Sequence, residues 1–453
     1  MRAVGTTELR ARFARRLSDL YGTEVPAYTT LVDECHLVNQ RVLDRDGAAA
    51  ERFGSIDRVT AERHGAIRVG TPAELAQVAR IFGALGMRPV GFYDLRDAHP
   101  QPIPVISTAF RPTDPGELAR NPFRVFTSML VPQDRRFFDA DLEERLLRFL
   151  DRRRLFPDEL LTLADRAERD GELTEAGAAR FLELAAAAFA LSPEPVDRAW
   201  YAELSRISGV AADIGGVSST HINHLTPRVL DIDELYTGMQ ARGIAMIDEI
   251  QGPPRWDGPD VLLRQTSFRA LAEPRAFREP DGTISEGRLR VRFGEVEARG
   301  IALTPAGRVL YDDLVTEVDR RVAAGEPRQE AAAGVWATGM PATEGELERR
   351  GLAFFTYRKA GGSLIADPIV YEDFLPRSAA GIFASNLGAA GEMDASQGGA
   401  PRDLAWLAEV IGRPIRVPEE IYAEQQEESL MRSGASPTIG RGARRVGSGS
   451  SAE

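Results

Sequence analysis

Two widely separated stretches of the chain share one order of predicted elements, and this internal repeat restricts the fold more than any other feature. The first stretch predicts a strand, a helix and three strands, at residues 63–69, 72–85, 88–95, 103–110 and 123–130. The second predicts the same order at residues 220–229, 231–242, 244–250, 261–270 and 288–297. We therefore expect an α+β fold that contains two modules of one kind.

The spacing inside the two modules also agrees. His64 lies eleven residues before Leu75 in the first module, and His224 lies eleven residues before Leu235 in the second. In the first module, Thr71 stands where a helix N-cap is expected, three residues before a glutamate, which is typical of a capping box. The two histidines thus occupy equivalent positions, each on the first strand of its module.

Around the modules the pattern is mainly helical, and the end of the chain is rich in glycine, serine and arginine. We expect six segments. They are an N-terminal helical segment, the first module, a helical insertion, the second module, a mixed region that closes the site and a disordered tail, at residues 1–60, 61–130, 131–215, 216–300, 301–430 and 431–453.

Composition removes several classes of function. The net charge is −12, and an acidic surface repels phosphate backbones, which argues against a nucleic-acid partner. Cys35 is the one cysteine, so neither an intrachain disulfide nor a thiolate zinc cluster is available. No apolar run has the length of a membrane span and no signal pattern is visible, so we expect a cytoplasmic protein without membrane contact.

A histidine site has few residues to draw on, because the chain contains only His36, His64, His99, His221 and His224. If the modules pair about a pseudo-twofold axis, the first strands face each other and the imidazoles of His64 and His224 point into a shared cavity. Neutral imidazoles bind iron, zinc, copper or nickel. The repeat therefore predicts a metal site between the modules.

The third ligand should lie on the last strand of the second module, beside its first strand. Glu295 and Glu297 share one face of that strand, because side chains alternate with period two. This periodicity leaves both glutamates open as ligand. Two histidines and one carboxylate form the facial arrangement that leaves three coordination positions open for substrate and oxygen.

Two further residues are candidates near this site. Arg68 lies four residues after His64, hence on the same face of the strand, where its guanidinium can bind a substrate carboxylate in bidentate fashion; the alternative is an ion pair at the surface. His221 lies three residues before His224, so on a regular strand it points to the opposite face, and we expect a supporting role for it.

Four runs of sequence resemble the 2-oxoadipate dioxygenase/decarboxylase family, also called 2-hydroxyglutarate synthases. They are HGAIR at 64–68, HINHLTPR at 221–228, FGEVEARG at 293–300 and FLPRSAAGIF at 374–383. The resemblance covers about residues 5–425. It implies a fold of the vicinal-oxygen-chelate superfamily, in which paired βαβββ modules form a cupped mixed sheet.

The resemblance also implies a site and a reaction. It implies Fe²⁺ held by His64, His224 and Glu295, with Arg68 as a catalytic residue that binds a substrate carboxylate. More weakly, it implies that Arg377 and Ser378 lie on a loop that closes on the substrate. The partners would be a small 2-oxo dicarboxylic acid and molecular oxygen, and 2-oxoadipate would become 2-hydroxyglutarate and carbon dioxide in lysine breakdown.

Two other interpretations keep the paired modules but change the function. One is another metalloenzyme of this superfamily, either a glyoxalase-like isomerase or a ring-cleaving dioxygenase. The other is a metal-free protein that binds a small ligand. Oxygen uptake, carbon dioxide release and metal content distinguish these possibilities.

Overall fold

The computed structural model describes residues 2–98, 101–290, 292–387, 393–394 and 396–434. Contacts within the chain divide it into two compact units. The first comprises Met1–Gly252, Leu263–Ala298 and Asp373–Val417, and the second comprises Pro253–Leu262, Arg299–Glu372 and Pro418–Glu453. Within the described ranges, no helix combines the length and apolar character needed to cross a membrane. The boundaries of the six predicted segments stay predictions.

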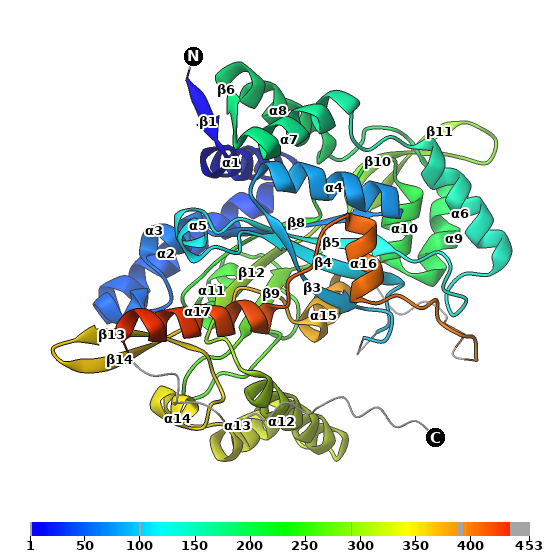
Figure 1. The fold of residues 1–453 in the computed structure, drawn as a ribbon. Coiled ribbons are helices and arrows are strands. Elements are labelled where there is room, and N and C mark those ends of the chain that lie inside the picture. Colours follow the sequence, from blue (N-terminus) through cyan, green and yellow to red (C-terminus); the bar gives the residue numbers. More distant parts are fainter. Residues whose placement is uncertain (1, 99–100, 291, 388–392, 395, 435–453) are drawn as a thin grey trace, which may run out of the picture. The chain divides into compact units, whose positions relative to one another are not determined.

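The first unit contains a five-stranded sheet in the order β3-β4-β5-β2-β8 (Figure 1). Its strands are β2 Arg63–Val69, β3 Arg88–Asp94, β4 Val105–Arg111, β5 Arg124–Leu130 and β8 His224–Pro227. Helix α4 (Pro72–Ala84) follows β2 and begins with the predicted capping box of Thr71 and Glu74. The predicted order of the first module is therefore confirmed, with one short helix, α5 (Pro115–Arg120), added between β4 and β5.

The second module repeats this arrangement on the other side of β8. Strand β12 (Gly294–Arg299) pairs with β9 (Leu263–Phe268), and a parallel bridge between Arg228 and Glu297 joins β12 to the end of β8. The same order, last strand beside first strand, occurs in the first module, where β5 runs parallel to β2. Because β2 and β8 pair antiparallel, the two modules meet along their first strands.

Three boundaries predicted for the second module are wrong. The predicted strand at 220–229 is shorter, since β8 covers only His224–Pro227. The predicted strand at 244–250 forms no continuous ladder and joins β9 through one isolated bridge, between Met246 and Phe268. The predicted strand at 288–297 is two strands, because residues 288–289 end β11 (Ile284–Leu289) and β12 begins at Gly294.

The division of that last strand has a local cause. Strands β10 (Glu273–Arg278) and β11 form an antiparallel hairpin, and the turn between them contains Pro280, Asp281 and Gly282. Gly282 has a φ of +85°, a left-handed conformation that glycine adopts without steric cost. The hairpin that this turn closes is inserted before the last strand of the module, which begins only at Gly294.

The two faces of the central sheet differ in what covers them. On one face, Ile67, Val69 and Val125 pack with Phe82 of α4 and Phe13 of α1 (Thr6–Glu24) in the main apolar core. Residues on the other face follow the alternate positions of the same strands and include the predicted metal ligands. The sheet thus buries one apolar core under helices on this face, while its opposite face combines the polar residues of the site with a second apolar cluster.

The other elements of the first unit are mainly helical. They are β1 Ala3–Gly5, α2 Pro26–Asp46, a 3-10 helix at Gly47–Glu51, α3 Ile56–Ala61, α6 Ala140–Arg152, α7 Asp158–Asp170, β6 Glu172–Thr174, α8 Glu175–Ala188, β7 Val196–Asp197, α9 Arg198–Ile207, α10 Gly209–Gly216, α11 Ile232–Ala241, α15 Pro376–Leu387 and α16 Leu404–Ile411. The helical N-terminal segment and insertion are therefore as predicted.

The second unit is smaller and combines helices with one hairpin. Its elements are α12 Pro305–Ala323, α13 Arg328–Gly339, α14 Glu344–Arg349, β13 Phe355–Ala360, β14 Ser363–Pro368 and α17 Pro418–Ser433. Residues 431–433, predicted to open a disordered tail, instead end α17, because the helical pattern continues to Ser433. The predicted tail from 435 onward lies outside the described residues.

A buried ion pair attaches the segment that precedes α15 to the sheet. Arg111 of β4 and Asp373 are both fully buried, with Nε–Oδ1 and Nη2–Oδ2 distances of 2.8 and 2.9 Å. Replacing Asp373 by alanine should lower the free energy of unfolding by about 3–5 kcal/mol, because the guanidinium stays buried without that counter-charge. Urea unfolding followed by circular dichroism measures the loss.

The matched control is Asp367→Ala, which breaks the exposed pair with Arg358. This change should cost about 0–1 kcal/mol, since exposed ion pairs contribute little. Equal losses in the two variants would show that the buried pair does not stabilise the fold.

Candidate metal centre

The pairing of β2 with β8 brings the two predicted histidine ligands together. His224 lies opposite Ala66, and His64 lies opposite Thr226, so both imidazoles project from the same face of the sheet. Their ring centroids are 5.4 Å apart and the ring planes are nearly perpendicular. Both side chains are almost completely buried.

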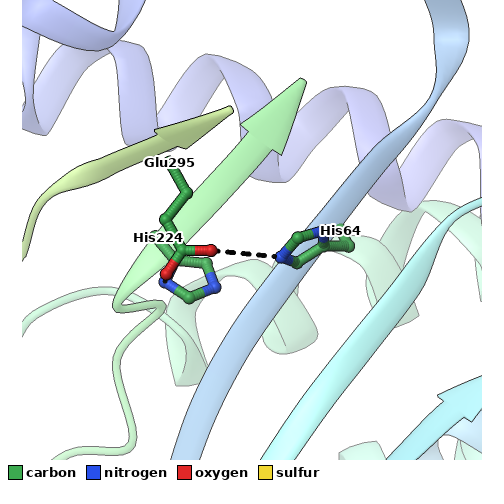
Figure 2. Close-up of side chains that lie close together, drawn as sticks. All are labelled: His64, His224 and Glu295. Atoms are coloured by element: carbon green, nitrogen blue, oxygen red, sulfur yellow. Dashed lines mark ion pairs between the residues drawn. The ribbon is translucent and has the colours of Figure 1, made fainter. Parts of the chain in front are cut away.

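Glu295 completes the group from the neighbouring strand β12. Its Oε1 lies 3.1 Å from Nδ1 of His224, and its Oε2 lies 3.5 Å from Nε2 of His64. One ligand atom from each of the three residues lies within 4.8 Å of the other two. Figure 2 shows the carboxylate between the two rings, each residue coming from a different strand. The structure therefore brings the three predicted ligands together.

The protonation of these groups suits a divalent cation. Burial by itself raises the pKa of Glu295, but His224 and His64 outweigh burial and lower that pKa to about 2. Burial lowers the pKa of His224, which favours the neutral imidazole that a metal needs. Nδ1 of His224 faces Glu295 at 3.1 Å, and its Nε2 has no hydrogen-bond partner among the described residues. Two imidazoles and a carboxylate with this geometry fit a metal ion.

Glu297 lies on the other side of His64. Its Oε2 is 2.9 Å from Nδ1 of His64, the ring nitrogen remote from Glu295. The structure thus separates the two glutamates that periodicity left open: Glu295 joins both histidines, and Glu297 contacts only the outer nitrogen of one. A carboxylate in that position orients a metal-binding imidazole and increases its basicity.

Behind Glu297 lies a group of buried charges, here called the charge quartet, formed by Glu62, Arg124, Arg228 and Glu297. Nη1 of Arg124 is 2.8 Å from Glu62 and 3.5 Å from Glu297, and Nη1 of Arg228 is 3.1 Å from Glu62. The side chains are essentially inaccessible to solvent. Two positive and two negative charges cancel, which permits their burial.

Sequence reasoning missed most of this quartet. Of its four residues, only Glu297 follows from the sequence pattern. Arg124 is the direct neighbour of His64 in the parallel pairing of β5 with β2. That neighbour relation needs the strand register, which local pattern does not supply.

Arg68 lies on the same face of β2 as His64, as predicted, and it is not at the surface. Its Nη1 makes a short ion pair with Oδ2 of Asp213 in α10, and both side chains are buried. His221 belongs to the same group, with Nε2 3.2 Å from Oδ1 of Asp213. The prediction that His221 points to the opposite face is wrong, because it assumed a strand that begins only at His224.

The C-terminal candidates are at the start of α15. The side chain of Ser378 is buried and that of Arg377 is exposed. The residue of this segment that contacts the metal group is Phe374, whose ring centroid is 4.9 Å from that of His64. Phe293 contacts His224 at a centroid distance of 5.4 Å. These rings, which sequence reasoning did not select, form apolar walls. His99 lies outside the described residues.

Comparisons with known proteins show which family this chain resembles. The family model for 2-oxoadipate dioxygenase/decarboxylase matches residues 13–386. A Mycobacterium tuberculosis protein named 2-oxoadipate dioxygenase/decarboxylase is 60% identical over 93% of this chain and 98% of its own length. A Pseudomonas putida protein of the same name is 39% identical over 94% of this chain and 96% of its own length.

Solved structures show the same likeness. The Pseudomonas putida hydroxyglutarate synthase in complex with 2-oxoadipate matches with a TM-score of 0.81 and 35% identity, over 95% of this chain and 98% of that chain. A putative glyoxalase superfamily protein from Ralstonia eutropha matches with a TM-score of 0.50 and 24% identity, over 66% of this chain and 84% of that chain. The second likeness concerns the fold alone and agrees with a vicinal-oxygen-chelate architecture.

The two glutamates should affect metal binding differently. Glu295→Gln replaces the carboxylate between the two imidazoles and should cause the larger loss of affinity. Glu297→Gln should weaken affinity by about 10–100-fold, because His64 loses the carboxylate that orients it. Titration of the purified variants with Co²⁺, followed by its visible absorption, measures both losses. Glu286→Gln on the exposed hairpin is the control, and a Glu297→Gln protein with that control's affinity would refute the orienting role.

Metal binding should also weaken on acidification. Burial acts to lower the pKa of His64, but Glu297 and Glu295 outweigh it and raise this pKa above the ordinary 6.5. A proton on His64 competes with the metal, so affinity should fall as pH drops through that raised value. Glu297→Gln removes a charge that raises the pKa of His64. In this variant the fall of metal affinity with decreasing pH, the acid limb of the curve, should therefore lie at lower pH. Co²⁺ titrations across pH test this, and superimposable acid limbs would contradict it.

Proposed function

The chain belongs to the 2-oxoadipate dioxygenase/decarboxylase family, and from this premise we propose that it converts 2-oxoadipate and oxygen into 2-hydroxyglutarate and carbon dioxide. We further propose that Fe²⁺ is the metal and that His64, His224 and Glu295 bind it. The observation that carries the proposal is the convergence of these three buried ligands on one point, in a chain so similar to enzymes of that name.

The metal ligands leave room for the reaction. Two histidines and one carboxylate would hold Fe²⁺ and would leave coordination positions open for a chelating 2-oxoacid and for oxygen. Bound Fe²⁺ supplies the oxygen activation and the oxidative decarboxylation, in which the bond between C1 and C2 breaks and C1 leaves as carbon dioxide. Both oxygen atoms of O₂ end in 2-hydroxyglutarate, one in the carboxylate formed at the former keto carbon and one in the new hydroxyl group, so no other oxidant or reductant is needed.

Arg68 is proposed to bind the carboxylate remote from the metal. It lies two residues beyond Ala66, the partner of His224, and a strand advances about 3.3 Å per residue. This places its backbone roughly 7 Å along β2 from the position opposite His224, comparable with the separation of the two carboxylates of 2-oxoadipate. A guanidinium is suited to such an end group because it donates paired hydrogen bonds.

The aromatic side chains beside the two histidines have a separate role. Phe374 and Phe293 lie against the two histidines and are buried. An apolar lining excludes water from the reacting groups and strengthens the electrostatic interactions within the site. Contacts of Arg377 and Ser378 with the substrate, a cytoplasmic location and a place in lysine breakdown stay predictions.

A single reaction series tests the proposal. The purified protein is mixed anaerobically with Fe²⁺ and 2-oxoadipate labelled at C1, and oxygen is then admitted. We expect one labelled carbon dioxide and one 2-hydroxyglutarate for each oxygen consumed. A glyoxalase-like isomerase would consume no oxygen, and a ring-cleaving dioxygenase would release no carbon dioxide. His224→Ala, which lacks a ligand, is the inactive control.

Removing the Arg68 guanidinium should mainly affect substrate binding. Arg68→Ala loses a charge-assisted hydrogen bond worth about 1.5–3 kcal/mol, so the KM for 2-oxoadipate should rise roughly tenfold to hundredfold. Steady-state oxygen uptake at varied 2-oxoadipate measures this change. An unchanged KM would refute the role of Arg68 in binding the carboxylate.

A further inference from the structure

The ion pair between Arg68 and Asp213 joins the proposed substrate site to a helix that the metal centre does not use. Asp213 lies in α10, a helix of the insertion between the two modules, and its side chain is 2% exposed. Arg68 is 4% exposed. A buried guanidinium needs a counter-charge, and Asp213 supplies one.

Asp213 is itself held from several directions. Nδ2 of Asn223 donates to its Oδ2 at 2.9 Å, and Nε2 of His221 lies 3.2 Å from its Oδ1. The side chains of His221 and Asn223, which precede β8, therefore hold the carboxylate of Asp213, and this carboxylate in turn binds Arg68. Burial acts to raise the pKa of Asp213, but His221 and Arg68 outweigh it and keep this pKa below its ordinary value, so the group stays ionised.

The backbone of the same run is attached to β2. The hydroxyl of Thr220 donates to the carbonyl oxygen of Arg68 at 2.6 Å, and the amide of Asn223 donates to that of Ala66 at 2.8 Å. The residues that fix Asp213 are therefore themselves fixed to the strand that carries Arg68. Such a closed set of contacts gives the guanidinium one orientation rather than several rotamers.

We propose that Asp213 is a positioning residue that sets the direction of the Arg68 guanidinium and thereby the preference for 2-oxoacids with a second, terminal carboxylate. The inference rests on the proposed function. Guanidinium donors lie in one plane, so an acceptor that holds Nη1 also decides where the other donors point. A second carboxylate that meets them gains charge-assisted hydrogen bonds, whereas a methyl end group gains none.

The test compares 2-oxoadipate with 2-oxohexanoate, which has the same chain length and no terminal carboxylate. Asp213→Asn keeps the shape of the side chain and removes its charge. We expect the KM for 2-oxoadipate to rise tenfold or more, kcat to change less than threefold and Co²⁺ affinity to stay unchanged. The kcat/KM ratio between 2-oxoadipate and 2-oxohexanoate should fall at least tenfold, and Asp213→Glu should restore part of it.

A double-mutant cycle separates positioning from a merely structural role. In an Arg68→Ala background, Asp213→Asn should change the KM less than twofold, because the residue through which it acts is gone. Additive effects, an unchanged substrate ratio in Asp213→Asn, or a parallel loss of Co²⁺ affinity would overturn the proposal. Asp165→Asn, which breaks an exposed pair with Arg80, is the control and should leave every value unchanged.

Two further measurements keep the outcome decisive. If Asp213→Asn does not fold, Asn223→Ala removes one hydrogen bond to Asp213 and should raise the same KM by a smaller factor, again only when Arg68 is present. Calorimetry without oxygen measures the affinity of the Co²⁺-loaded protein for 2-oxoadipate, and thus the effect of Asp213 on substrate binding without turnover. If the wild-type protein binds 2-oxoadipate but does not convert it, the proposed function alone is contradicted. If the wild-type protein converts 2-oxoadipate and Asp213→Asn binds it with unchanged affinity, this inference alone is contradicted.

Discussion

The antiparallel pairing of β2 with β8 is the contact on which the metal centre depends. It places His224 opposite Ala66 and His64 opposite Thr226, so that both imidazoles project from one face at neighbouring positions. Side chains alternate along a strand, and a shift of one residue would turn a histidine toward the helix-covered face. The apolar residues on that face, among them Ile67 and Leu225, oppose such a shift, because it would turn them from the apolar core toward the charged residues of the site. Core packing and ligand geometry therefore select the same register.

The buried charges on the face that carries the site are tolerated because they are arranged in neutral groups. The charge quartet contains two arginines and two glutamates, and Arg68 is matched by Asp213. Unpaired, any of these buried charges would cost several kcal/mol. Because they are paired, these charges can stay buried and hold the side chains of His64 and Arg68 in place. The site thus consists of a small metal-binding group at the centre and two supports, one on each side, that are as buried as the ligands.

Local signals predicted the elements well where they were strong and failed where the chain departs from the repeat. The capping box at Thr71 placed the start of α4 correctly. The turn around Gly282 was present in the sequence, but the repeat suggested a continuous strand, and the inserted hairpin was missed. His221 was placed on the wrong face for a similar reason, because its periodicity was counted through residues that precede β8. Periodicity holds only inside a regular strand.

The sequence by itself determined the two modules, the equivalent positions of His64 and His224, and the restriction of the third ligand to Glu295 or Glu297. These follow from spacing and alternation, which are properties of neighbouring residues along the chain. Only the tertiary structure decided which glutamate lies between the imidazoles, and that Glu62, Arg124 and Asp213 support the site. Those contacts join residues far apart in sequence, and they exist only once strand register and helix packing have brought the charges together in a place that excludes water.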